Sequence, residues 1–325
     1  ESLVKKIKEG DKSSLAKSIT LVCSHLKKDE KQTELLLKKI LKVKKNSYRI
    51  GISGIGGVGK STFVGVLGKF ILEQNSQSKI AVLTIDPSSP KGGGSILGDG
   101  VRMGELSSDE RAFVRSLANQ GLSGGVTHQV QEILCLLEAA GYDYILVESV
   151  GAGQSDSSIA YLCDAFIHLQ MPASGDAVQA IKKGSGELAD FIVVHKNDGI
   201  LKHDAERTKV FYEQAHSLQK LTRQQNLPEV LLVSSIEKTG IKELWNLVLK
   251  KKSLDSKQGF LEKRREEQLF KIFKEQVASV FQKEIFNCQK FSKDLGKIRE
   301  DLVKQKTSPL LAARELVDKA LSSRS

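Results

Sequence analysis

The chain has 325 residues and a formal net charge of +11, with 40% hydrophobic and 27% charged residues. These values predict a globular protein with one large domain and additions to it. No stretch approaches the roughly 18 unbroken apolar residues of a membrane span, so we expect no membrane contact.

The positive charge is unevenly distributed. Residues 1–46 carry 13 Lys and Arg against 6 Asp and Glu, and residues 250–325 carry 19 against 11. The segment between them is net acidic. In the flanking segments lysines alternate with glutamates and apolar residues, a pattern typical of solvated helix faces. Contact with an acidic protein or ligand is the alternative, and a nucleic-acid partner is not expected.

Cysteine spacing and the N-terminal composition bear on the compartment. The cysteines are far apart and form no metal-binding pair, which favours reduced thiols and a reducing compartment. The N-terminal segment is rich in Lys rather than Arg and has no apolar signal core. We therefore expect the bacterial cytoplasm rather than the mitochondrial matrix. The four cysteines are Cys23, Cys135, Cys163 and Cys288.

Apolar residues recur with helical spacing over residues 3–45, with an expected break at Lys28–Lys31. Residues 48–250 then alternate short β-rich runs with helical stretches, which predicts a mostly parallel sheet with crossover helices. The expected strands are 48–53, 79–85, 142–149, 165–170, 190–195 and 229–235.

The sequence GIGGVGKST follows the first expected strand and matches G-x-x-x-x-G-K-[ST]. Its glycines let backbone N–H groups surround phosphate oxygens at the positive end of the next helix. Lys60 would reach the β- and γ-phosphates, and Ser61 would offer its hydroxyl to Mg²⁺. The fold class is therefore an α/β P-loop NTPase. Its phosphate loop is expected to comprise Gly54, Gly56, Gly57, Val58, Gly59, Lys60, Ser61 and Thr62.

Two carboxylates stand at expected strand ends beside this loop, as phosphoryl transfer requires. Asp86 follows the second strand, and Glu148 ends the third. In many nucleotide hydrolases an Asp occupies the place of Glu148 and contacts Mg²⁺ through water, and the glycine three residues later, here Gly151, senses the γ-phosphate. The glycine-rich stretches 91–103 and 150–158 are candidate nucleotide-dependent switches, with ordinary surface loops as the alternative.

The fifth expected strand ends in VVHKND, residues 193–198. Most GTP-binding proteins recognise guanine with Asn-Lys-x-Asp. Lys196 and Asp198 keep that pattern, whereas His195 replaces the Asn. After the sixth strand, SSIEKTG resembles the last guanine-contacting loop, which usually reads Ser-Ala-x. The residues expected at the base there are Ser234, Ser235, which replaces the Ala, and Ile236.

His195 leaves two hypotheses open. The Asp of the motif accepts hydrogen bonds from guanine N1–H and the 2-amino group, whereas the Asn mainly contacts N7 and braces the P-loop. Because N7 is an acceptor in both purines, losing that contact costs on the order of 1 kcal/mol of affinity and little selectivity. His195 could donate to N7 itself, or it could merely fill a core position. We expect a retained preference for guanine with weaker or pH-sensitive affinity.

From Lys251 the chain is rich in Lys, Glu and Gln and is helical in pattern, with Pro309 as the only strong breaker. This tail has few apolar residues, so we do not expect it to form a core of its own. The expected organisation is an N-terminal helical segment (1–46), a P-loop GTPase domain (47–250) and a C-terminal helical extension (251–325).

Several longer blocks resemble one family, the MeaB/ArgK-type P-loop GTPases, once called LAO/AO transport ATPases. The blocks are DPSSPKGGGSILGDGVRM (86–103), VESVGAGQSD (147–156) and GDAVQAIKKGSGELAD (175–190). The resemblance implies a homodimer formed by the C-terminal helices, GTP and GDP as ligands, and switch regions at about 91–103, 150–158 and 174–188. It also implies Mg²⁺ binding through Ser61 with Asp86, Asp99 and Glu148, which act in catalysis together with Lys60.

The resemblance implies a partner as well. GTP hydrolysis would gate the delivery of adenosylcobalamin to an acyl-CoA mutase, most simply methylmalonyl-CoA mutase, and would help to protect or reactivate that enzyme. Two other functions stay open. A kinase or transport-associated ATPase is disfavoured by Lys196 and Asp198, and a metal-insertion GTPase is disfavoured by the lack of a Cys/His cluster.

Overall fold

The computed structural model describes residues 2–24, 26–43, 47–86, 103–118, 125–149, 154–172, 186–220 and 227–322. Contacts divide the chain once, into compact units Glu1–Gln268 and Leu269–Ser325. The three-part organisation with boundaries after residues 46 and 250 stays a prediction.

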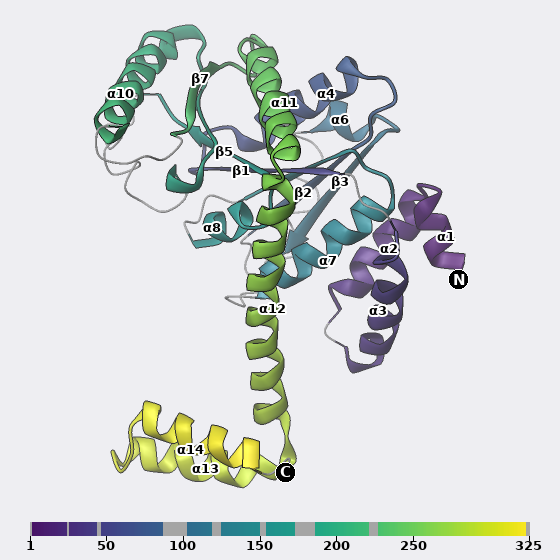
Figure 1. The fold of residues 1–325 in the computed structure, drawn as a ribbon, viewed down its shortest axis with the longest axis vertical. Helices are drawn as coiled ribbons and strands as arrows, with labels where there is room; N and C mark the ends of the chain where they lie inside the picture. The colour runs from purple at the N-terminus through teal and green to yellow at the C-terminus, as the bar shows by residue number, and fades with distance from the viewer. Residues whose placement is uncertain are drawn as a thin grey trace. The chain divides into compact units, whose positions relative to one another are not determined.

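The first unit is built on a seven-stranded, entirely parallel sheet with the order β3-β2-β4-β1-β5-β6-β7 (Figure 1). The predicted α/β fold with a parallel sheet is therefore confirmed. Six strands lie where they were expected, and β3 was not anticipated. The strands are β1 (Tyr48–Gly54), β2 (Ile80–Asp86), β3 (Ala112–Ala118), β4 (Tyr144–Glu148), β5 (Ala165–Gln170), β6 (Phe191–His195) and β7 (Glu229–Val233).

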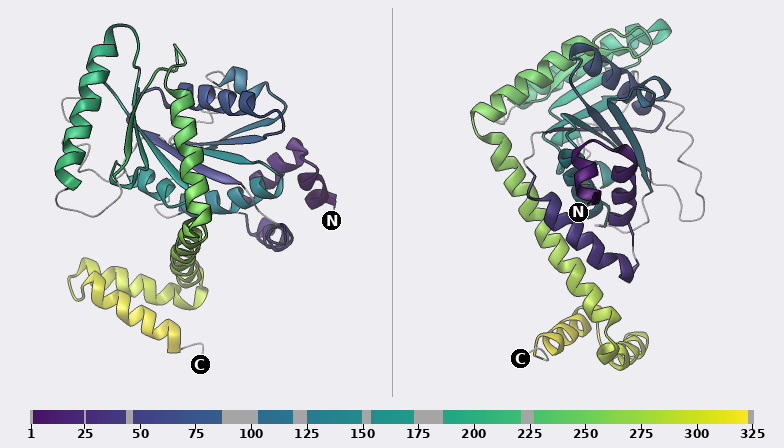
Figure 2. Two further views of the ribbon diagram at one scale, coloured as in Figure 1. Left: turned by 45° about the horizontal axis from the view of Figure 1, so that its top comes forward. Right: turned by 90° about the vertical axis from the view of Figure 1, so that its right-hand side faces the viewer.

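Helices cover both faces of the sheet (Figures 1 and 2). Alternate residues of β1 point to the two opposite faces of the sheet. Ile50 and Ile52 lie in the apolar cluster with α4 and α11, whereas Arg49 binds Glu138 of α7 and Gly51 packs on α8. The bounds are α4 (Lys60–Gln74), α6 (Gly104–Ser107), α7 (Gly125–Ala139), α8 (Gln154–Ala160), α10 (Lys202–Lys220) and α11 (Ile241–Lys257), with short 3₁₀ turns at Gly186–Leu188 and Gly199–Leu201.

Three N-terminal helices, α1 (Ser2–Lys8), α2 (Lys12–Val22) and α3 (Lys27–Ile40), pack on α7. Asp11 caps α2, since its carboxylate accepts a 2.8 Å hydrogen bond from the Ser14 amide. The expected break at Lys28–Lys31 is wrong. The chain turns after Cys23, and α3 already begins at Lys27 with acidic residues in its first turn, which suits the positive end of a helix.

The long helix α12 (Phe260–Asn287) begins in the first unit, where Arg265 binds Asp164 at 2.6 Å and Gln268 donates to the Cys163 carbonyl at 2.8 Å. The second unit contains the rest of α12, α13 (Gln289–Val303) and α14 (Pro309–Ser322). The expectation that the tail forms no core of its own is therefore wrong, since this unit has a small core that includes Ile285, Phe291 and Leu316. None of the helices in the described ranges is both long enough and apolar enough to cross a membrane.

Candidate functional site

The phosphate loop joins β1 to α4, in the centre of the sheet. Two of its glycines are required by the backbone. Gly54 has φ 151°, and a Cβ there would lie 2.6 Å from the Leu169 carbonyl oxygen, whereas Gly59 has φ 96° at the start of α4. The first intrahelical bond runs from Phe63 N to Gly59 O, so the amides before Phe63 are the ones that a phosphate would accept from.

Lys60 lies against its own loop. Its Nζ donates to the carbonyl oxygens of Gly54 at 2.6 Å and Ile55 at 3.1 Å, and the residue is only 8% exposed. Burial lowers the pKa of Lys60, and the nearby carboxylates of Glu148 and Asp156 oppose that shift. The amino group therefore sits inside the loop, where phosphate oxygens could replace the two carbonyls as acceptors.

Ser61 and Glu148 meet although they are far apart in sequence. The Ser61 hydroxyl donates to Glu148 Oε1 at 2.8 Å, and Glu148 is buried at the end of β4. Asp86 ends β2, the neighbour of β4, two positions beyond the Thr84–Glu148 pair. The backbone thus brings both predicted carboxylate positions to the edge of the sheet that carries the phosphate loop.

Several predicted positions lie outside the described residues. These are Asp99, Gly151, the side chain of Asp86, and most of the expected switch segments 91–103, 150–158 and 174–188. Their roles stay predictions.

His195 ends β6 and is buried between two loops, with 3% of its surface exposed. Its Nδ1 lies 2.7 Å from the Val58 carbonyl oxygen, and its Nε2 lies 2.7 Å from Ser235 Oγ. Both ring nitrogens therefore have protein partners, and in this arrangement neither is left over for purine N7.

The next residues of the motif also face the nucleotide loops. Lys196 adopts a left-handed backbone conformation with φ 62°. Its Nζ donates to the Gly57 carbonyl at 2.8 Å, so the side chain spans from the loop after β6 to the P-loop. The Asp198 carboxylate accepts a short hydrogen bond from Ser234 Oγ, which itself accepts from the Glu237 amide at 3.0 Å. Ser234 thus orients the carboxylate that the sequence assigns to guanine.

The β7–α11 loop is closed by Gly240. Ser234 N donates to Thr239 O at 3.1 Å, and Gly240 has φ 77° where a Cβ would lie 2.1 Å from the Leu232 carbonyl oxygen. Ser235 is buried, whereas Ile236 is 79% exposed. Because the Ser235 hydroxyl points to His195, this loop offers a base mainly its backbone.

A group of buried polar side chains that no sequence pattern indicated lies on the face of the sheet opposite α4. Among the described residues, no hydrogen-bond partner is found for Ser53 Oγ, Ser149 Oγ, Asp156 Oδ1 or His168 Nδ1, all of them buried. Burial lowers the pKa of His168, Asp156 opposes this shift and Lys60 adds to it. Ser53 of β1 pairs with His168 of β5 in the sheet register, and Asp156 lies in α8. A Ser or His on a strand carries no pattern that would have revealed this group.

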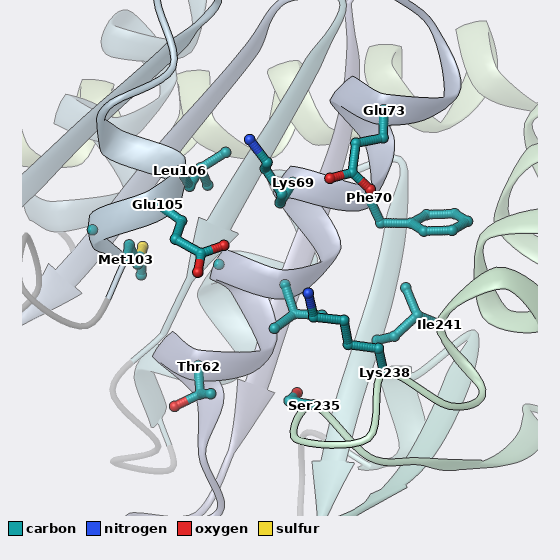
Figure 3. Close-up of a pocket in the computed structure, with 13 residues that line it drawn as sticks. Thr62, Lys69, Phe70, Glu73, Met103, Glu105, Leu106, Ser235, Lys238 and Ile241 are labelled. Atoms are coloured by element: carbon teal, nitrogen blue, oxygen red, sulfur yellow. The ribbon is translucent and has the colours of Figure 1, made fainter.

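A hollow of about 500 Å³ borders the site, between α4, α6 and the β7–α11 loop (Figure 3). Thr62 and Ser235 line it at the nucleotide end, and Phe70 and Leu106 contribute apolar surface. Neither Lys60 nor Glu148 lines this hollow, so it adjoins the phosphate loop at Thr62 without including these two charged residues.

Comparison with known proteins now decides the family. The model of the family described as "Methylmalonyl Co-A mutase-associated GTPase MeaB" matches residues 15–290. The chain belongs to the MeaB family. The resemblance seen in the sequence blocks is thereby confirmed.

Two curated members and one solved structure illustrate the relationship. "GTPase ArgK" of Escherichia coli is 36% identical over 290 residues, covering 89% of this chain and 87% of that protein. "Methylmalonic aciduria type A homolog, mitochondrial" of Caenorhabditis elegans is 36% identical over 331 residues, covering 98% and 82%. A crystal structure described as "LAO/AO transport system kinase" superposes with a TM-score of 0.74 at 30% identity and covers 98% of this chain and 97% of that one. This MeaB-family chain is a GTPase, as expected, and its family implies guanine-nucleotide binding.

Proposed function

We propose that this MeaB-family GTPase is a chaperone of an adenosylcobalamin-dependent acyl-CoA mutase, with methylmalonyl-CoA mutase as the first candidate. Its GTP hydrolysis would gate cofactor loading and help to protect or reactivate the mutase. The match over residues 15–290 carries the proposal, because the family is described by its association with methylmalonyl-CoA mutase.

The site geometry supports the nucleotide part of this proposal. Lys60 would exchange its two carbonyl acceptors for β- and γ-phosphate oxygens, and α4 would direct its first amides at the same phosphates. Asp198, oriented by Ser234, would accept from guanine N1–H and the 2-amino group. Glu148 would orient the metal-binding hydroxyl of Ser61.

The residues also fit Mg²⁺. Ser61 Oγ and Glu148 Oε1 lie 2.8 Å apart, and both are oxygen ligands of the kind that Mg²⁺ prefers. Asp86 and Asp99 are further candidate ligands. Bound Mg²⁺ would neutralise charge that develops on the β- and γ-phosphates. Within the described residues there is no group of three or more His, Cys, Asp or Glu side chains that could hold a metal ion.

A homodimer is part of the proposal. Within the second unit, apolar side chains of α12 recur every three or four residues on one helix face and are each more than half exposed. A second copy of this helix would bury such a stripe. The stripe consists of Phe270, Phe273, Val277 and Val280.

The compartment stays a prediction. The relatives include bacterial proteins and proteins named as mitochondrial, so the bacterial cytoplasm expected from the N-terminal composition awaits a direct localisation.

Binding to the mutase is the direct test. The purified chain would be mixed with purified apo-mutase in the presence of GDP or a non-hydrolysable GTP analogue, and complex formation followed by size-exclusion chromatography. We expect nucleotide-dependent co-elution and a nucleotide-dependent rate of adenosylcobalamin loading. A cobalamin-independent acyl-CoA enzyme serves as the control. Failure to bind any acyl-CoA mutase in either nucleotide state would contradict the proposal.

Nucleotide competition separates this function from a transport-type ATPase. Unlabelled GTP should displace a fluorescent GDP analogue far better than ATP does, because adenine offers no N1–H to Asp198. Equal displacement by the two nucleotides would favour the ATPase alternative.

A further inference from the structure

Two departures from the usual guanine-binding motifs lie in direct contact. His195 stands where Asn is usual, and Ser235 stands where Ala is usual, 40 residues later. Their side chains meet through His195 Nε2 and Ser235 Oγ at 2.7 Å, and both residues are buried. The opposite ring nitrogen reaches the P-loop at the Val58 carbonyl, also at 2.7 Å.

The partners fix which atom carries each proton. A carbonyl oxygen can only accept, so His195 Nδ1 must carry the hydrogen that it gives to Val58. Burial lowers the pKa of His195, so the ring is neutral near pH 7 and Nε2 presents a lone pair. The Ser235 hydroxyl therefore donates to Nε2, and each polar atom of the pair is used once.

The surroundings leave the ring one position. A Cβ on Gly59 would lie 2.9 Å from His195 Cε1, and the Phe63 ring meets the imidazole edge-on with the centroids 5.7 Å apart. The ring is therefore enclosed by the start of α4 as well as by its two hydrogen-bond partners. A shift toward purine N7 would break both hydrogen bonds inside the protein.

We infer that His195 and Ser235 are matched positioning residues, which together tie the P-loop to the β7–α11 loop and do not contact the base. In the usual motif one Asn serves both the P-loop and N7. In this chain the His195 ring and the Ser235 hydroxyl form hydrogen bonds only within the protein, between the P-loop and the β7–α11 loop. Lys196 adds a second link to the P-loop through the Gly57 carbonyl. The pair sets how tightly nucleotide is held, whereas the choice of guanine stays with Asp198.

If the two residues are matched, the loss of nucleotide affinity in each single variant should be reversed in the double variant, which two independent buried residues would not show. Ser235→Ala removes one oxygen atom and leaves Nε2 as a buried acceptor without a donor. His195→Asn leaves the Ser235 hydroxyl buried without its acceptor. The double variant restores the usual Asn and Ala combination and leaves neither group stranded, so the two losses should cancel rather than add.

The test is a double-mutant cycle on the full chain, in which fluorescent GDP is titrated into wild type, both single variants and the double variant. We expect each single variant to bind GDP about tenfold more weakly and the double variant to bind within about threefold of wild type. The preference for GTP over ATP should be unchanged in all four, because Asp198 sets that preference. His203→Asn, the same exchange at an exposed position of α10, is the matched control.

Three results would overturn the inference: additive losses in the double variant, unchanged GDP binding in both single variants, or a changed preference between GTP and ATP. Melting of each protein without nucleotide shows that it is folded, and Ser235→Ala, the smallest change, keeps the test decisive if His195→Asn does not fold. The inference rests on guanine-nucleotide binding and not on the mutase. A protein that shows this cycle yet binds no mutase would refute only the proposed function.

Discussion

At the scale of single residues, the site is organised by buried polar contacts between segments that are distant in sequence. Ser61 reaches Glu148, His195 reaches Val58 and Ser235, and Lys60 is held inside its loop. The types and spacing of these residues could be read from the sequence. Their partners could not, because a hydrogen bond between positions 87 or 137 residues apart leaves no local pattern.

Lys60→Met tests the phosphate contact, because Met keeps the apolar stem and removes the charge. GTP affinity should fall by about tenfold to a hundredfold, since a charged hydrogen bond to phosphate is lost. The measurement is a titration with a fluorescent GTP analogue. Lys69→Met, on the same helix but outside the phosphate loop, should bind as wild type does, and equal losses in the two variants would contradict the assignment.

Burial of histidine predicts an acid-sensitive fold. The folded pKa of His168 lies below its ordinary value of 6.5, so the unfolded chain binds protons first as the pH falls. Above about pH 6.5, protonation of His168 therefore does not lower the free energy of unfolding. As the pH falls below that value toward the folded pKa, the free energy of unfolding decreases. Urea unfolding at about pH 7.5 and pH 5.5 measures this loss. His168→Gln should lose less stability over that interval than wild type, and an identical loss would show that His168 does not titrate as argued.

At the scale of elements, the parallel sheet brings the segments of the site to one edge. These segments are the phosphate loop, the C-terminal ends of β2 and β4 at Asp86 and Glu148, and the loops after β6 and β7 that are predicted to bind the base. Alternation of short apolar runs with helical stretches was enough to predict this arrangement and six of its strands. β3 was missed because Arg115 and Ser116 interrupt its apolar run. Arg115 donates to Thr20 of α2 at 3.2 Å, a tertiary contact that a short sequence window does not contain.

The β7–α11 loop depends on Gly240, and Gly141 offers a matched comparison. Both glycines have positive φ, but a Cβ on Gly240 would lie 2.1 Å from the Leu232 carbonyl oxygen, whereas a Cβ on Gly141 would meet no atom within 4 Å. Gly141→Ala should cost about 1 kcal/mol for the left-handed backbone alone. Gly240→Ala should cost at least about 2 kcal/mol and weaken GDP binding, because the loop must move. Urea unfolding compares the two, and equal costs would contradict the role given to the loop.

At the scale of the whole molecule, contacts divide the chain at residue 268, although the composition changes near residue 250. The first turns of α12 belong with the sheet, since Arg265 binds Asp164, which also accepts from the Arg49 amide at 2.8 Å. A Lys- and Glu-rich helix gives no sign of such an anchor. The second unit instead carries the exposed apolar stripe from which we propose a dimer.

Phe273→Lys with Val277→Lys tests that dimer. Two charges in the middle of the stripe would have to be buried in the interface, so the chain should become a monomer in sedimentation equilibrium. Leu35→Lys, at an exposed apolar position of α3, should leave the assembly unchanged. A double variant that remains dimeric would place the interface elsewhere.

A guanine-specific GTPase that serves an acyl-CoA mutase should respond to that enzyme. The measurement is the rate of phosphate release from GTP and from ATP as the concentration of methylmalonyl-CoA mutase is increased. We expect slow hydrolysis of GTP that rises with the mutase and saturates, with little hydrolysis of ATP at any mutase concentration. A rate of GTP hydrolysis that does not respond to saturating mutase, or an equal rate of ATP hydrolysis, would contradict the proposed function.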